Sequence, residues 1–350
     1  MHVNTTNINT KTVSQYRGTY KTHLDTLAQL TDGNKGKDKK SAKTDGKAVF
    51  LKRARSKYYS LKVVYGLLQL NSPLHKQYQR AYYCSNTLSA RKPGQLIADK
   101  YCNSRACNIC NRIRTAKLMN GYINQLGDIN ELKFGTLTAG KRVTCDELPR
   151  RIDEMTKAFR LIINKKLRYM HGRKGGVKWS GVRKIEVTYC HKTNTYHPHI
   201  HFIGGQYSDM IIKEWLKLFP NASHKAQDLR TADKNSLNEL FKYSTKQLSR
   251  TKGKNMQIDV CPVALDVIFR SLDKRRTFQP YGIIKAVNEE VGEEENSQHY
   301  ENLPCTDAIY WTYNYDVYDW INIHGECLTG YKPPAVTFNY IEVTEKVTDE

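Results

Sequence analysis

Three histidines at alternate positions in an apolar run constrain the fold of this chain more than any other feature. They are His197, His199 and His201, within the segment 196–205. A β-strand has a side-chain period of two, so we expect the three imidazoles on one face and Ile200 buried on the other. Pro198 cannot donate to a ladder and is expected at the start of the strand, which leaves His199 and His201 as the firm pair.

Two imidazoles on one strand, about 7 Å apart, can converge on one divalent cation. A strand over 182–189 is expected to pair with the histidine strand through a turn at 191–195, which places Glu186 opposite His199 or His201. A His/His/Glu set of this kind suits Mg²⁺ or Mn²⁺. The alternative is a pair of half-buried histidines at a sheet edge, with Glu186 as an exposed partner of a lysine.

The charge of the chain is strongly basic and unevenly distributed. Residues 289–350 hold 2 Lys+Arg against 14 Asp+Glu, a net charge of −12, whereas residues 1–288 hold 54 against 20, a net charge of +34. A basic body of this size predicts a polyanionic partner, with nucleic acid as the default. The sequence has no apolar run of about 20 residues and a polar N-terminus, so we expect a cytoplasmic protein without a membrane contact.

A cysteine-rich segment precedes the histidine strand. Its four thiols follow the spacing C-x17-C-x4-C-x2-C and are Cys84, Cys102, Cys107 and Cys110. Four thiolates complete a tetrahedral zinc shell and leave no open position, so we expect a structural Zn²⁺ site; the alternative is a group of buried free cysteines. Arg105, Arg112 and Arg114 surround the segment and are expected to contact phosphates.

Apolar periodicity predicts a mixture of helices and strands. The expected helices cover 49–72, 111–126, 146–170, 208–219 and 234–249, and the expected strands cover 132–140, 182–189, 197–205 and 282–287. In the last of these helices, Glu239, Tyr243 and Lys246 recur at steps of four and three residues. A carboxylate, a phenol and an ammonium are therefore expected on one helix face.

The order of these motifs resembles the HUH endonucleases, and more closely the rolling-circle replication initiators of small bacterial plasmids. The motifs are Phe134–Thr138, then His199-Ile200-His201, then Glu239 with Lys242-Tyr243 and Lys246. The cysteine-rich segment also resembles one that such initiators have before the first motif. The resemblance covers about residues 80–290.

The resemblance implies an α+β fold, in which helices flank a central antiparallel sheet with the histidine pair at its middle. This HUH/RRM-like nicking domain would be joined to a zinc-stapled, cysteine-rich N-terminal module. We therefore expect a flexible basic arm at 1–48, the cysteine-rich DNA-contacting module at 49–118, the nicking domain at 119–288 and an acidic, aromatic segment at 289–350.

The resemblance also implies a reaction. Tyr243 would attack a phosphodiester of single-stranded or hairpin DNA at a replication origin, giving a 5′-phosphotyrosine and a free 3′-OH. A phenol with a pKa near 10 needs activation, which a metal on His199 and His201 together with Lys246 would supply. Glu239 would activate water for the terminating cleavage. Lys242 would join the arginines in DNA binding.

Several alternatives remain open. The same chemistry serves relaxases and single-strand transposases, although a relaxase usually has its tyrosine near the N-terminus, before its histidines. A non-catalytic, zinc-containing nucleic-acid-binding protein is the alternative from another class. His197 competes with Glu186 as the third metal ligand. The expected setting is a bacterial plasmid or mobile element, with host helicase and DNA polymerase as partners; the oligomeric state is left open.

Overall fold

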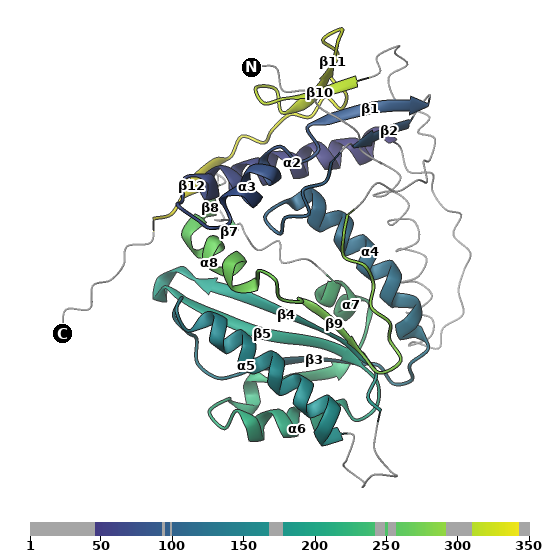
Figure 1. Ribbon diagram of the computed structural model, residues 1–350, viewed down its shortest axis with the longest axis vertical. Helices are drawn as coiled ribbons and strands as arrows, with labels where there is room; N and C mark the ends of the chain where they lie inside the picture. The colour runs from purple at the N-terminus through teal and green to yellow at the C-terminus, as the bar shows by residue number, and fades with distance from the viewer. Residues whose placement is uncertain are drawn as a thin grey trace, which may run out of the picture.

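A five-stranded antiparallel sheet lies at the centre of the protein, in the order β6-β3-β5-β4-β9 (Figure 1). The computed structural model describes residues 46–92, 95–98, 100–167, 178–241, 249–250, 257–291 and 310–342. The sheet consists of β3 (Lys133–Thr138), β4 (Gly181–Cys190), β5 (Thr195–Gly204), β6 (Asp228–Thr231) and β9 (Phe278–Tyr281). The expected α+β class with a central antiparallel sheet is thus confirmed, and the histidine strand β5 is its middle strand.

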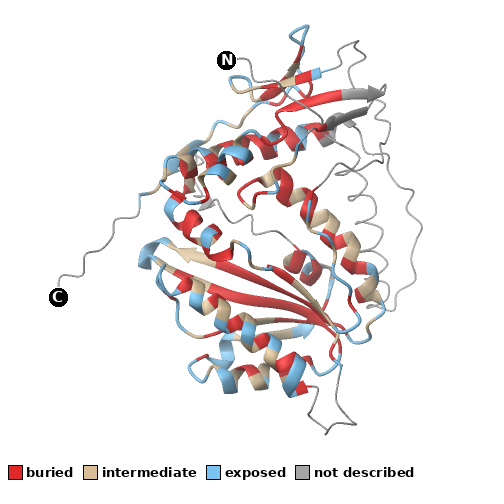
Figure 2. Cartoon of the chain, in the orientation of Figure 1, coloured by how far each residue is buried: buried red, intermediate tan, exposed pale blue. Residues whose placement is uncertain are grey.

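One face of the sheet packs against α5 (Leu148–Leu161), a π-helix (Ile162–Leu167), α6 (Ser208–Leu218) and α8 (Pro262–Leu272). Ile200 is fully buried on this face, as the alternation predicted, and Ile185 and Phe202 lie beside it. The helices contribute Phe159 and Trp215 to the same apolar core. Figure 2 shows buried residues along most of β3, β4 and β5.

The opposite face of the sheet packs against α4 (Asn108–Gly127) and α7 (Lys234–Phe241). Phe241, at the end of α7, stacks on Phe278 of β9, with ring centroids 6.0 Å apart. Ile203 belongs to this second core, and residues 199, 201 and 203 of a strand share a face. The histidines therefore lie on the same side of the sheet as α4 and α7.

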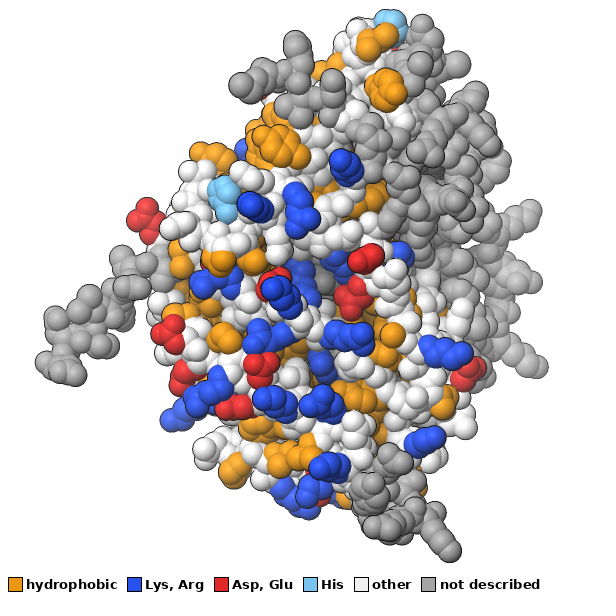
Figure 3. All heavy atoms as spheres, viewed as in Figure 1, with side chains coloured by type: hydrophobic (Ala, Val, Ile, Leu, Met, Phe, Trp, Pro, Cys, Tyr) orange, Lys and Arg blue, Asp and Glu red, His pale blue; other side chains and the backbone are white. Residues whose placement is uncertain are grey.

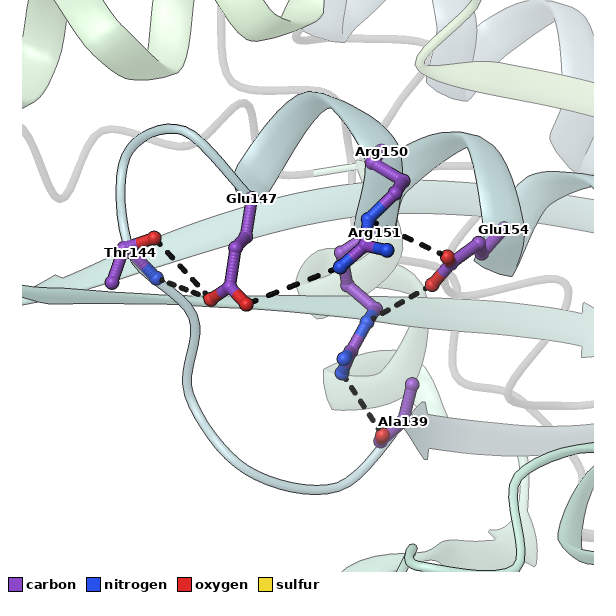
Figure 4. A network of polar contacts seen from close by, with 6 residues as sticks. All are labelled: Ala139, Thr144, Glu147, Arg150, Arg151 and Glu154. Atoms are coloured by element: carbon purple, nitrogen blue, oxygen red, sulfur yellow. Dashed lines mark hydrogen bonds and ion pairs between the residues drawn. The ribbon is translucent and has the colours of Figure 1, made fainter.

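The start of α5 is tied to the end of β3 by polar contacts (Figure 4). The Arg151 guanidinium donates to the Ala139 carbonyl over 3.1 Å and pairs with Glu154 over 3.2 Å. The Thr144 backbone N–H donates to the Glu147 carboxylate. These contacts fix the end of β3, whose last residue, Thr138, pairs with His199.

A second region joins segments that lie far apart in the sequence. It contains α2 (Gly46–Leu68), α3 (His75–Tyr82) and two smaller sheets, β11-β10-β1-β2 and β12-β8-β7. The strands are β1 (Thr87–Lys92), β2 (Gln95–Ala98), β7 (Ser249–Arg250), β8 (Gln257–Val260), β10 (Tyr310–Asn314), β11 (Asp319–Asn322) and β12 (Thr337–Tyr340). Strand β10 pairs with β1, and β12 runs parallel to β8. The expected domain boundaries stay predictions, and most of the expected arm, residues 1–45, lies outside the described residues.

Two local expectations were wrong. The strand expected over 282–287 is absent from the described residues. Strand β9 ends at Tyr281, and Gly282 makes a turn with a φ of +70°. The backbone of Lys285 and Val287 then donates hydrogen bonds to Gln125 and Tyr122 of α4. Strand β5 begins at Thr195 rather than at Pro198. Pro198 is tolerated because its nitrogen faces the side on which β3 has already ended, beyond the Thr138–His199 pair.

Among the described residues, none of the helices combines the length and the apolar character that a bilayer span requires.

Candidate active site

Strands β4 and β5 bring Glu186, His199 and His201 together on one face of the central sheet. Glu186 pairs with His199, one of the two partners that the sequence predicted for it, and Lys184 pairs with His201. One potential ligand atom from each of the three side chains lies within 4.8 Å of the other two. The His201 Nε2 and Glu186 Oε2 atoms are 3.9 Å apart. The geometry is therefore compatible with a shared cation.

Neighbouring groups fix the orientation of both imidazoles. The His199 Nδ1 lies 3.1 Å from the His197 carbonyl oxygen, which can only accept a hydrogen bond. The Nδ1 of His199 therefore bears the proton, and its Nε2 keeps a lone pair for a ligand bond. The His201 Nδ1 lies 2.9 Å from the Thr136 hydroxyl, and its ring stacks on Phe134 at 5.5 Å.

Glu186 is a buried carboxylate with a buried lysine as its partner. The Lys184 Nζ donates to the Glu186 Oε2 over 2.8 Å. Burial acts to raise the pKa of Glu186, but the charge and hydrogen bond of Lys184, followed by the two histidines, outweigh it and lower the pKa from 4.5 to about 2. The carboxylate is consequently charged at neutral pH, which a metal ligand must be.

His197 is half-buried on the same face but does not join the cluster of three. Its ring lies 5.9 Å from that of His199, and its pKa is lowered by burial and, to a smaller extent, by the neighbouring His199. Of the three histidines expected from the alternating pattern, the structure thus groups His199 and His201 with the carboxylate.

The expected catalytic helix is described only in its first part. Glu239 lies on α7 and is half-buried. Lys242, Tyr243 and Lys246 lie outside the described residues. Their roles stay predictions.

Each of the three arginines expected to bind DNA has internal partners. Arg105 donates to the Leu272 and Arg275 carbonyls, Arg112 to the Lys52 carbonyl and Ser56 hydroxyl, and Arg114 to the Asn103 and Glu289 carbonyls. Arg114 is 5% exposed. Contacts of these arginines with phosphate stay predictions. In this structure, the three arginines join α4 and the loop that precedes it to the segments that pack around them.

The four cysteines of the cysteine-rich segment come together at the start of α4. Their Sγ atoms all lie within 4.8 Å of one another, and those of Cys84 and Cys102 are each 3.6 Å from that of Cys110. A tetrahedral shell with Zn–S bonds of about 2.3 Å has sulfur atoms about 3.8 Å apart. Backbone N–H groups of Cys102 and Ser104 also point at sulfur atoms of the cluster. The residues present therefore fit a structural Zn²⁺.

Sequence reasoning missed two residues of the site, Lys184 and Thr136. Lys184 could have been found from the sequence, because it lies two positions before Glu186 and therefore shares its strand face. Thr136 lies within the motif Phe134–Thr138 and pairs directly with His201. Only the strand register, however, reveals that these two side chains meet the metal-ligand candidates.

Comparison with known proteins gave two matches. A family model described as "Replication protein" matches residues 94–321 of the chain, a span that includes the cysteine pair at 107 and 110 and the whole central sheet. A protein of Staphylococcus aureus named "Protein rep" is 29% identical over 187 residues, which covers 47% of this chain and 77% of that relative. No solved structure gave a significant match.

Proposed function

This chain belongs to the Replication protein family, and we propose that it initiates rolling-circle replication of a bacterial plasmid by nicking one DNA strand at the origin. The observation that supports nicking best is the grouping of His199, His201 and Glu186 at the middle of the sheet. A replication protein that only bound DNA would have no need of a buried, charged carboxylate held between two oriented imidazoles. Single-stranded or hairpin DNA would be the substrate, and the bacterial cytoplasm the setting.

The donor set of this cluster suits Mg²⁺ or Mn²⁺. It offers two imidazole nitrogens and one carboxylate oxygen, and three protein ligands leave further positions for oxygen atoms of a substrate. When bound there, the cation would withdraw charge from the non-bridging oxygens of the scissile phosphate.

Tyr243 would supply the nucleophile. Its phenol oxygen would bond to the phosphorus while the bond from phosphorus to the 3′ oxygen breaks; the 3′ oxygen takes up a proton, and the strand is left as a 5′-phosphotyrosine. Phe241, two positions earlier in the chain, stacks on Phe278, which pairs with Lys184. The described end of α7 therefore lies beside the strand that bears Glu186, which supports this assignment.

Three other side chains of this helical segment would assist. Lys246 would favour the phenolate or bind phosphate, and Lys242 would contact the DNA backbone. Glu239 would take a proton from water or from a second attacking group in the terminating cleavage, so that the enzyme is released rather than left attached. Host DNA polymerase would extend the free 3′-OH, and a host helicase would separate the strands.

The distribution of charge agrees with a DNA substrate. Figure 3 shows Lys and Arg side chains across the visible face of the protein, with fewer acidic ones among them. The cysteine cluster, with Zn²⁺ bound, would hold the module that contains α2, α3 and the start of α4. It would have no catalytic part, because four thiolates leave no open position.

The test is covalent capture of DNA. Labelled single strands that tile the DNA around the reading frame are incubated with the full chain and Mn²⁺, and adducts are separated on a denaturing gel. Wild type should form an adduct that resolves. Tyr243→Phe should form none, and Glu239→Gln should form one that persists. Tyr207→Phe changes an exposed tyrosine at the start of α6 and serves as the matched control.

Two outcomes contradict the proposal. An adduct that survives in Tyr243→Phe would reject this tyrosine as the nucleophile. No adduct with any strand, despite DNA binding by the folded protein, would favour the non-catalytic binding protein.

A further inference from the structure

A cavity of about 470 Å³ lies between α2, α3 and the C-terminal strands, and its wall consists largely of tyrosines. Tyr58, Lys62 and Tyr65 reach it from α2, and Tyr82 from the end of α3. The β10–β11 turn and the chain around β12, which lies along α2 in Figure 1, complete the wall. None of its lining residues belongs to the candidate active site, and we call it the tyrosine pocket.

Among the residues that the structure describes, one cation lies against the aromatic wall of the tyrosine pocket. The Lys62 Nζ is 5.3 Å from the centroid of the Tyr58 ring and 5.1 Å from that of Tyr318. It also donates to the Tyr318 hydroxyl over 3.1 Å. Lys62 is half-buried, so its ammonium is held in place yet reachable from the cavity. A cationic ligand is disfavoured, because this position against the rings already holds a positive charge.

The aromatic rings around Lys62 are positioned by one another. Tyr82 and Tyr315 stack with centroids 5.2 Å apart and an interplanar angle of 7°. Tyr65 lies at the rim, 54% exposed, with its ring 6.0 Å from that of Tyr340. Burial raises the pKa of Tyr58, Tyr82 and Tyr340, the last to about 12, so these phenols are neutral at pH 7 and do not repel an anion.

We propose that the tyrosine pocket binds an unpaired base of single-stranded DNA, with an adjacent phosphate on Lys62. Flat aromatic side chains that accept any base by stacking, combined with cations that follow the backbone, are the usual components of single-strand binding sites. The volume of the cavity lies in the range of small-ligand sites. Arg55 is exposed on the same side of α2, two turns or about 10 Å before Lys62, and provides a second phosphate contact.

This site extends the proposed function, and it rests on that function only in taking single-stranded DNA as the substrate. It would hold bases that flank the nick, away from the reacting phosphodiester. The sequence does not reveal the function of the C-terminal segment 310–342. In this proposal, the segment supplies half of the wall of the tyrosine pocket.

The first test measures the affinity of the full chain for a fluorescent thymidine oligonucleotide by anisotropy, in buffer without Mg²⁺ or Mn²⁺ and without a chelator, so that no strand is nicked and zinc on the cysteine cluster is kept. Tyr65→Ala should weaken binding about 5- to 100-fold, the loss expected for one stacked base. Lys62→Gln should also weaken binding and reduce its salt dependence. Tyr65→Phe keeps the ring and should bind as wild type does. Tyr207→Ala, at an exposed tyrosine immediately before α6, is the matched control.

The second test needs no substitution. Oligonucleotides with bromodeoxyuridine are crosslinked to the wild-type chain by light, and peptides that contain Tyr65 or Tyr82 should acquire the crosslink. Wild-type affinity in both Tyr65→Ala and Lys62→Gln, equal losses on duplex DNA, or crosslinks confined to other segments would each overturn the proposal. Binding without Mg²⁺ or Mn²⁺ and adduct formation by the wild type in Mn²⁺ are separate measurements, so failure of this site and failure of nicking are distinguishable.

Discussion

Replacement of Lys184 by Met should destabilise the protein through the carboxylate that it leaves behind. Lys184 and Glu186 are 3% and 7% exposed, and the Nζ and Oε2 atoms are 2.8 Å apart. Methionine preserves most of the volume of the lysine but removes its charge. Glu186 would then remain buried beside two imidazoles without the positive charge that Lys184 places at hydrogen-bond distance.

Two independent arguments give the size of the effect. Removal of one partner of a buried ion pair typically costs about 3–5 kcal/mol. The lowering of the pKa of Glu186 from 4.5 to about 2 corresponds to about 3 kcal/mol of stabilisation at pH 7, of which Lys184 supplies the largest favourable part. We therefore expect Lys184→Met to lower the free energy of unfolding by about 3 kcal/mol.

The pH dependence of this effect has a definite sign. The pKa of Glu186 is lower in the folded protein, so its stabilisation is fully present above about pH 4.5 and is lost as the pH falls toward 2. The difference in stability between wild type and Lys184→Met should therefore be largest near neutral pH and shrink between pH 4.5 and pH 2.

Urea unfolding followed by tryptophan fluorescence measures this difference, because Trp179 and Trp215 are buried in the core beneath the sheet. Buffer without Mg²⁺ or Mn²⁺, and without a chelator that would also strip the cysteine cluster, keeps these cations from the Glu186 site. The control is Lys184→Met combined with Glu186→Gln, which leaves no charge and should recover most of the loss. A loss below about 1 kcal/mol for the single variant at pH 7, or an equal loss for the double variant, would refute the reasoning.

Three further predictions follow from the same structure. Cys110→Ser should lose zinc and melt at a lower temperature, whereas Cys145→Ser, at an exposed thiol, should keep the zinc content and the melting temperature of the wild type. A chromogenic chelator measures the zinc released from the unfolded protein, and unchanged zinc content in Cys110→Ser would contradict the four-cysteine site. His197→Ala should still form the covalent DNA adduct on a denaturing gel, since its ring lies outside the cluster, and loss of the adduct would make it a ligand. Asp319→Ala should cost about 1–3 kcal/mol in urea unfolding, because that buried carboxylate accepts hydrogen bonds from the backbone amides of 329–331; a neutral result would reject this network.

Local periodicity was sufficient to predict the centre of the fold. Alternation in the segment 196–205 assigned Ile200 to the core and His199 to the opposite face. The short turn limited the partner of Glu186 to His199 or His201, and the structure pairs it with His199. The strand predicted over 282–287 failed for a local reason. Gly282 has a positive φ, and the turn that it makes ends β9. Ile283 is apolar but 61% exposed, so the apolar pattern of this segment was misleading about burial.

Long-range pairing could not be predicted from the sequence in this way. Strand β10 pairs with β1 more than 200 positions earlier, and β12 pairs with β8, yet nothing in the periodicity of 310–342 selects those partners. The tyrosine pocket exists only because of this pairing. Its tyrosines belong to segments that the sequence assigned to different domains, so no local motif could have identified them as one site.

The central sheet and the second region, which contains the β12-β8-β7 sheet, are joined along the chain where α7 is followed by β7. Phe241 ends the described part of α7 against the central sheet, and β7 resumes at Ser249 in a sheet with β8 and β12. Tyr243 thus belongs to the stretch of chain between a helix that packs on the central sheet and the sheet that β12 completes. β12 also contributes to the tyrosine pocket. DNA held in the proposed tyrosine pocket would therefore contact the same small sheet in which the described chain continues after α7.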